Sequence, residues 1–105
     1  MAPSAICQPM SDHIERIAIT GLVQGVFYRK WAQATAQGLG LRGFVRNMAD
    51  GSVEAVLAGE KERLDAFAEA ALAGPPQARV EQVERSPAKE ADLPPGDGVE
   101  IADDG

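Results

Sequence analysis

The sequence predicts an α+β fold in which two helices cover one face of a mixed, mainly antiparallel sheet of four to five strands. Its length of 105 residues suits one compact core and is too short for two. Apolar residues alternate along several short segments and recur at helical spacing along two longer ones. These segments follow one another in the order βαββαβ with an extra strand, which is the order of a ferredoxin-like sandwich.

The chain divides into a domain and two short flanking segments. Residues 1–12 contain two prolines among small and polar residues and show no period, so we expect a flexible N-terminal extension. The domain is expected over residues 13–102, and an acidic tail over 103–105. Because Cys7 is the only cysteine, no internal disulfide can form.

A strand, a helix and a second strand are expected in the first half. Alternating apolar residues predict a strand over 14–23, and helical spacing predicts a helix over 29–39. The second strand is expected over 41–47. The apolar stripe of the helix comprises Trp31, Ala34, Thr35, Gly38 and Leu39.

A hairpin and a second helix follow. The pair Asp50-Gly51 is a strong turn signal, and alternating apolar residues predict a strand over 53–57. The helix expected over 60–73 is the clearest in the sequence, and Gly74 with two following prolines ends it. Its apolar stripe comprises Leu64, Phe67, Ala68, Ala71 and Leu72.

The last part of the chain predicts two more strands. Val80 and Val83 are out of phase within the strand expected over 78–85, which indicates a β-bulge or a shifted end. A loop over 86–98 then precedes a short last strand over 99–101. The sheet residues expected to face the helices are Ile17, Ile19, Val53 and Leu57.

The charge pattern favours a site for a small anion. The net charge of −6 argues against a general binder of nucleic acid or of anionic membranes. Residues 13–47 nevertheless contain only one acidic residue, Glu15, against five basic ones: Arg16, Arg29, Lys30, Arg42 and Arg46. This segment indicates an anion site within an acidic surround, although solvated cations on exposed faces would give the same pattern.

Composition excludes several other classes. One histidine, His13, and one cysteine are too few for the usual zinc site. No segment approaches the roughly 20 apolar residues that cross a bilayer, and no secretory signal is visible. We therefore expect a cytoplasmic protein that needs no metal, no membrane and no nucleic acid. No long exposed apolar stripe demands a partner, so we expect a monomer.

The junction between the first strand and the first helix carries the strongest site signal. Gly21 and Gly25 let backbone N–H groups converge there, beside the positive end of the helix dipole. Arg29 in the first helical turn opposes that dipole, and a bound anion would compensate for it. An ordinary glycine turn with a solvated arginine is the alternative.

Asn47 is the second candidate. A right-handed crossover makes the first two strands parallel, so the end of the second strand, at Asn47, lies at the same edge as the glycine loop. A neutral amide can orient a water molecule without attracting its proton strongly. The alternative is an asparagine that forms the turn of the hairpin. Alternation sends Arg46 to the opposite side, where we expect a surface cation.

Three motifs, in order, resemble those of acylphosphatases. The family patterns are V-Q-G-V-x-[FY]-R, G-[WF]-V-R-N and D-G-x-V-E, and this chain has VQGVFYR at 23–29, GFVRN at 43–47 and DGSVE at 50–54. The resemblance covers residues 14–101. Phe44 stands where tryptophan is commonest, and Val99 replaces the usual aromatic residue, which leaves the packing of the last strand open.

This resemblance implies hydrolysis of a small-molecule acyl phosphate to a carboxylate and inorganic phosphate, without metal or cofactor. Arg29 would bind the phosphoryl group, and Asn47 would orient the attacking water. The backbone amides that would share the phosphate are those of Gln24, Gly25, Val26, Phe27 and Tyr28. The sequence offers no credible general base, so an oxygen of the phosphate itself would accept the proton of the water.

Two other functions remain open. A non-catalytic phosphate-binding or regulatory domain could use the same loop, although the presence of both Arg29 and Asn47 speaks against it. An RNA-recognition domain shares the topology but needs exposed aromatic residues on its central strands. Phe44 is the only aromatic residue expected on a strand here.

Overall fold

The computed structural model describes most of the chain between the two flanking segments. The described residues are 13–25, 27–94, 96 and 98–102. The expected extension over 1–12 and the expected tail over 103–105 lie outside them.

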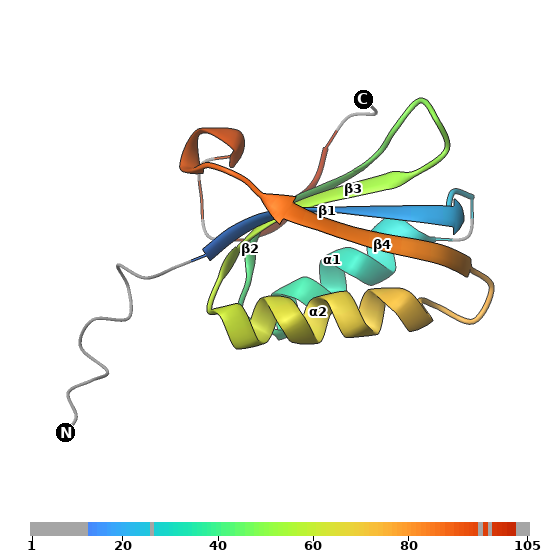
Figure 1. Cartoon of the computed structure of the whole chain (residues 1–105), viewed down its shortest axis with the longest axis horizontal. Coiled ribbons are helices and arrows are strands. Elements are labelled where there is room, and N and C mark those ends of the chain that lie inside the picture. Colours follow the sequence, from blue (N-terminus) through green and yellow to red (C-terminus); the bar gives the residue numbers. More distant parts are fainter. Residues whose placement is uncertain (1–12, 26, 95, 97, 103–105) are drawn as a thin grey trace, which may run out of the picture.

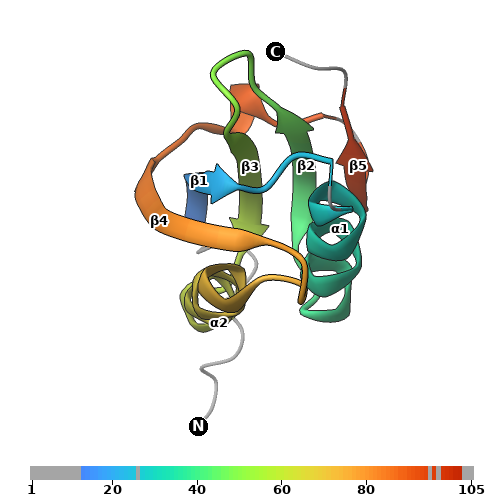
Figure 2. The same ribbon diagram turned by 90° about the vertical axis from the view of Figure 1, so that its right-hand side faces the viewer.

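The architecture is the predicted ferredoxin-like α+β sandwich (Figure 1). The elements are β1 (His13–Leu22), α1 (Tyr28–Gly38), β2 (Arg42–Asn47), β3 (Val53–Gly59), α2 (Lys61–Ala73), β4 (Arg79–Pro87), a 3₁₀ turn (Glu90–Asp92) and β5 (Val99–Ile101). The five strands lie in the order β4-β1-β3-β2-β5, and both helices cover the same face of the sheet (Figures 1 and 2). Only the β2–β5 pair is parallel among the described strands, so the sheet is mixed and mainly antiparallel.

The first helix packs through a different stripe from the one expected. Tyr28, Ala32 and Ala36 are its buried residues, whereas Ala34 and Gly38 are exposed. The helix begins at Tyr28, one residue earlier than expected, and this large side chain sets the buried face at spacings of four residues. The expected stripe of α1 is therefore wrong for Ala34 and Gly38, whereas Trp31 and Leu39 are partly buried and pack against the core.

The second helix confirms four of the five expected core residues. Leu64, Phe67, Ala68 and Ala71 are buried, but Leu72 is 55% exposed. The four buried residues follow the spacing i, i+3, i+4 and i+7, and Leu72 lies beyond this stripe near the last turn of the helix. The expectation that Leu72 faces the sheet was wrong.

The irregular spacing of apolar residues in the fourth strand, β4, is caused by a β-bulge. Thr20 of β1 pairs with Gln82, but the next residue, Gly21, pairs with Val80. Glu81 is therefore an extra residue in β4. The bulge lets Val80 and Val83 pack against the same core despite their odd spacing, which confirms the bulge that the sequence indicated.

The last strand is secured by the first helix as well as by the sheet. Val99, at the position where the family usually has an aromatic residue, is buried. Gln33 donates a hydrogen bond to the carbonyl of Val99 at 2.7 Å, and the N–H of Val99 donates to Oε1 of Gln37 at 3.2 Å. These bonds hold β5 against α1 and beside β2, so the carboxyl ends of β2 and β5 lie next to each other.

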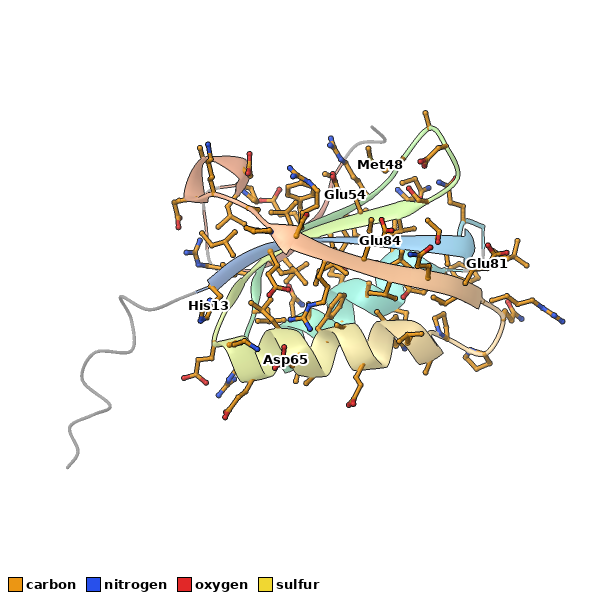
Figure 3. All side chains as sticks on the ribbon, viewed as in Figure 1. His13, Met48, Glu54, Asp65, Glu81 and Glu84 are labelled. Carbon is orange, nitrogen blue, oxygen red and sulfur yellow. The ribbon has the colours of Figure 1, made fainter. Side chains whose placement is uncertain are left out.

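The face of the sheet opposite the helices carries a charged cluster around Glu54 (Figure 3). Glu54 is only 8% exposed, and its carboxylate accepts hydrogen bonds from Arg16 at 2.8 Å and Arg46 at 2.9 Å. Arg46 also lies over the ring of Phe44, 5.4 Å from its centroid. Arg46 lies on the predicted side, but as a paired cation rather than a solvated one.

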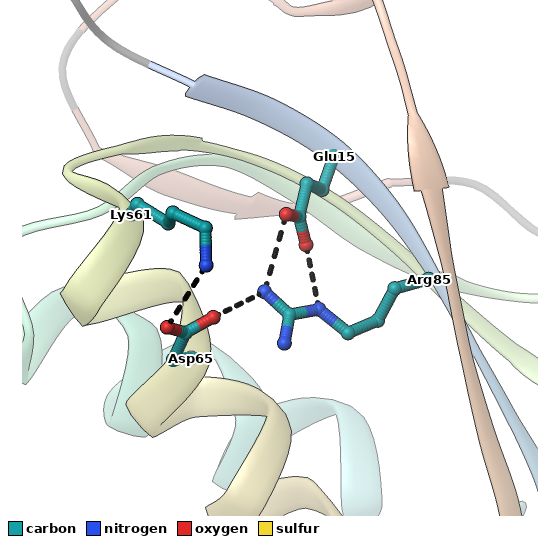
Figure 4. A network of polar contacts seen from close by, with 4 residues as sticks. All are labelled: Glu15, Lys61, Asp65 and Arg85. Carbon is teal, nitrogen blue, oxygen red and sulfur yellow. Dashed lines mark hydrogen bonds and ion pairs between the residues drawn. The ribbon is translucent and has the colours of Figure 1, made fainter.

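A second network ties α2 to the sheet (Figure 4). Arg85 of β4 binds Glu15 of β1 through two hydrogen bonds of 2.8 and 3.1 Å, and it reaches Asp65 of α2 at 2.7 Å. Lys61 lies 3.4 Å from the same aspartate. The hydrogen bond from Arg85 lowers the pKa of the Asp65 carboxyl, so the network stays charged at neutral pH.

Candidate functional site

A hollow of about 340 Å³ opens where the β1–α1 loop meets the ends of β2 and β5. The β1–α1 loop lies at the end of the molecule that faces the viewer in Figure 2. The hollow is lined by Val23, Gly25, Phe27, Tyr28, Arg29, Lys30, Asn47 and Ile101. The hollow therefore has a cationic and amide part and an apolar part. His13 lies at the start of β1, at the far end of the sheet from this loop (Figure 3).

The loop before α1 turns sharply through two residues with left-handed backbone. Gly25 has φ +79°, which glycine adopts without strain. Phe27, the N-cap residue of α1, has φ 61° and ψ 24°, a conformation that costs a bulky residue on the order of 1–3 kcal/mol. Phe27 is also 79% exposed, so core packing does not account for its conformation.

Tyr28 anchors the loop to the rest of the fold. Its side chain is 1% exposed, and its hydroxyl donates a hydrogen bond to the carbonyl of Ala71 in α2 at 2.7 Å. Its ring packs beside Trp31, with the ring centroids 5.3 Å apart. Burial raises the pKa of the Tyr28 hydroxyl, which therefore remains a neutral donor. The side chain of Tyr28 thus holds the first turn of α1 in place.

Gln24 ties the loop to the β2–β3 hairpin. Its Nε2 donates to the carbonyl oxygens of Met48 and Ser52, both at 2.9 Å. Met48 follows Asn47 directly in the chain. One side-chain amide therefore fixes the distance between the glycine loop and the end of β2. The sequence predicted a role only for the backbone amide of Gln24, because no periodicity or local spacing reveals this side-chain contact.

Arg29 and Lys30 lie in the first turn of α1, and both line the hollow. Arg29 is half-buried, whereas Lys30 is exposed. No acidic residue occupies this turn. The positive potential of the two side chains therefore adds to that of the helix N-terminus, which makes this part of the hollow suited to an anion.

Asn47 lines the hollow and does not supply the bonds that close the following turn. The N–H of Met48 donates to the carbonyl of Ser52 at 2.8 Å, and the N–H of Gly51 donates to the carbonyl of Met48 at 3.1 Å. The N–H and hydroxyl of Ser52 both bond to Asp50, at 3.0 and 2.6 Å. These contacts account for the turn, and they argue against the interpretation of Asn47 as a turn former.

The structure thus brings five of the seven predicted site residues around one hollow: Gly25, Phe27, Tyr28, Arg29 and Asn47. Gln24 contacts the hairpin instead, and Val26 lies outside the described residues. Ile101 and Lys30 also line the hollow, although the sequence did not predict either residue there. The parallel pairing of β5 with β2, which brings Ile101 to this edge, was the missing information.

Two further properties concern possible cofactors and membranes. Among the residues that the structure describes, no group of three or more His, Cys, Asp or Glu side chains is placed to hold a metal ion. No helix in that part of the chain is long and apolar enough to span a bilayer.

These features define a class: a small ferredoxin-like α+β domain with a cationic, amide-lined hollow at its β1–α1 junction. The acylphosphatase family model matches residues 15–94. An acylphosphatase of Rhodospirillum rubrum is 47% identical over 78 residues, which cover 74% of this chain and 86% of that protein. One of Azorhizobium caulinodans is 43% identical over 90 residues, covering 86% of this chain and 95% of that protein.

Solved structures agree with these relatives. An acylphosphatase from Coxiella burnetii superposes with a TM-score of 0.80 at 28% identity, covering 90% of this chain and 97% of that one. The acylphosphatase from Bacillus subtilis gives a TM-score of 0.72 at 33% identity, with coverage of 85% and 97%. The chain belongs to the acylphosphatase family.

Proposed function

We propose that this protein hydrolyses acyl phosphates to a carboxylate and inorganic phosphate, with Arg29 and Asn47 as its catalytic residues. The observation that carries the proposal is the presence of both side chains around one hollow, although they belong to different elements. Membership of the acylphosphatase family supports the reaction itself.

The phosphoryl group is held by the β1–α1 loop in this proposal. The guanidinium of Arg29 binds two phosphoryl oxygens, and the backbone N–H groups of residues 24–28 bind the others. These donors stabilise the charge on the equatorial oxygens as the bond to the leaving group lengthens. Donors that are in position before substrate binds need little reorganisation during the reaction.

Asn47 orients the attacking water on the other side of the phosphorus. The water oxygen forms a bond to phosphorus while the bond from phosphorus to the acyl oxygen breaks, and the carboxylate leaves with that electron pair. The proton of the water passes to a phosphate oxygen. A carboxylate is a good leaving group, so neither a strong acid nor a metal is required of the protein.

A direct assay tests the reaction. The purified protein should release benzoate and phosphate from benzoyl phosphate at the same rate with and without a chelator, and inorganic phosphate should inhibit competitively. Binding of phosphate without turnover is the behaviour of a regulatory domain and would contradict the proposal. Activity that a chelator abolishes would contradict the metal-free mechanism. A monomeric state and a cytoplasmic location stay predictions, and size-exclusion chromatography checks the first.

Gln24 provides a test of how the site is positioned. Gln24→Ala should lower kcat about tenfold, because Asn47 and the glycine loop lose their common anchor. It should also lower the free energy of unfolding by about 1–2 kcal/mol, as expected for two lost hydrogen bonds. Gln82→Ala is the matched control, since the side-chain amide of Gln82 bonds to the exposed Glu84 on the same strand, β4, at 2.9 Å. An unchanged kcat in the Gln24 variant would show that its role is structural only.

A further inference from the structure

A second hollow adjoins the first at the start of α1. It has a volume of about 330 Å³ and is lined by Phe27, Pro75, Pro76 and Gln77. Phe27 also lines the hollow that contains Arg29. One aromatic side chain therefore borders both spaces, and a ligand that extends from the cationic hollow past Phe27 reaches the two prolines.

The fold holds the two prolines beside the loop. The hydroxyl of Tyr28, the first residue of α1, bonds to the carbonyl of Ala71 at 2.7 Å. The ring of Tyr28 also lies against Gly74, where an added Cβ would be 3.1 Å from Cε2 of the ring. The N–H of Ala78 donates to the carbonyl of Pro75 at 3.0 Å and closes the turn. The second hollow is thus preformed, as binding sites for small molecules usually are.

Phe27 is unusual both in its backbone conformation and in the exposure of its side chain. Its φ of 61° lies in the left-handed region, which bulky residues rarely occupy. Its side chain is 79% exposed and lies outside the buried core cluster. An apolar ligand that covered this ring would remove apolar surface from water without disturbing any core contact.

We propose that Phe27, Pro75 and Pro76 form a subsite for the acyl group of the substrate and favour aromatic acyl groups over acetyl. This inference rests on the proposed function, in which the loop and Arg29 hold the phosphoryl end. The acyl end then projects out of the cationic hollow and passes along Phe27. A phenyl group can stack on this ring and contact the prolines, whereas a methyl group covers little of either.

The experiment compares kcat/KM for benzoyl phosphate with kcat/KM for acetyl phosphate. The ratio of the two constants should exceed one in the unmodified protein and fall about five- to tenfold in Phe27→Asn. Asparagine is chosen because it tolerates the left-handed backbone at this position. Pro76→Ala, at an exposed position, should lower the same ratio about twofold. Phe27→Tyr should leave the ratio as it is in the unmodified protein, because the aromatic ring is kept.

Leu72→Ala is the matched control, because Leu72 is an exposed apolar residue that lines neither hollow, so the ratio should not change. Ile101→Ala tests the rival contact for the acyl group, because Ile101 lines the cationic hollow from β5. A shift of the ratio in Ile101→Ala and not in the Phe27 and Pro76 variants would overturn the subsite. An unchanged ratio in both Phe27→Asn and Pro76→Ala, with both substrates still hydrolysed, would do the same.

A binding measurement separates this inference from the proposed function. The phosphonates that replace the bridging oxygen by CH₂ cannot be hydrolysed. The inhibition or dissociation constants of the phenyl and methyl analogues should differ in the unmodified protein, and Phe27→Asn should reduce the difference by the same factor. Absence of hydrolysis with a retained preference for the phenyl analogue would contradict the proposed function alone. Equal affinities for the two analogues would contradict the subsite alone.

Discussion

Arg29→Ala should lower kcat/KM for benzoyl phosphate by about a thousandfold or more, which corresponds to about 4 kcal/mol of transition-state stabilisation. Competitive inhibition by inorganic phosphate should disappear as well, because the same guanidinium binds the phosphoryl group in substrate and product. Steady-state kinetics with benzoyl phosphate, together with titration of phosphate against the backbone amide signals of Gly25 and residue 29, measures both effects.

Two further variants separate the shape of the guanidinium from its charge. Arg29→Lys keeps the charge but cannot form two parallel hydrogen bonds to one phosphoryl group, so most of the loss should remain. Arg42→Ala removes an arginine that is paired with Glu90 and does not line the hollow, so kcat/KM should change less than twofold. Comparable losses in the Arg29 and Arg42 variants would mean that general electrostatic attraction, rather than a specific contact, holds the substrate.

The order of elements could be predicted because it depends on local patterns. A few neighbouring residues are enough to show a period of two or of 3.6 residues, and the same holds for the turn at Asp50 and the helix stop at Gly74. The phase of the buried face was harder to predict. In α1 the buried face includes Tyr28, whose side chain packs inward and bonds to the distant Ala71, whereas the sequence pattern placed that residue before the helix. Leu72 likewise fits its stripe by spacing but is 55% exposed, and it lines a surface hollow with Val83 and Arg85 of the edge strand β4.

The residues of the candidate site also divide into those that local patterns predict and those that depend on the packed structure. Arg29 and Asn47 could be found because a motif and one rule of topology bring the ends of β1 and β2 to the same edge. The contacts of Gln24 could not be predicted, because its partners, Met48 and Ser52, lie 24 and 28 positions further along the chain and share no periodic pattern with it. The second hollow depends on the α2–β4 turn approaching the start of α1, an arrangement that only the packed structure specifies.

Asn47→Ala should lower kcat for benzoyl phosphate by a factor of about 10²–10³ and leave the inhibition constant of inorganic phosphate within about twofold. The reason is that Asn47 acts on the attacking water, whereas the loop and Arg29 bind the phosphoryl group. A defect confined to kcat is the signature of an interaction made only in the transition state. Kinetics of hydrolysis and of product inhibition, measured on one preparation, give both quantities.

The turn-forming interpretation of Asn47 makes the opposite prediction. A turn former would lower the free energy of unfolding when it is replaced, yet the hydrogen bonds of this turn come from Met48, Asp50, Gly51 and Ser52. Asp50→Ala is therefore the matched control: it should destabilise the hairpin by about 1 kcal/mol, whereas Asn47→Ala should change stability by less than about half of that. Urea denaturation of the two variants distinguishes the roles. A stable Asn47 variant with normal turnover would remove the residue from the mechanism, and a destabilised one with normal turnover would return it to the turn.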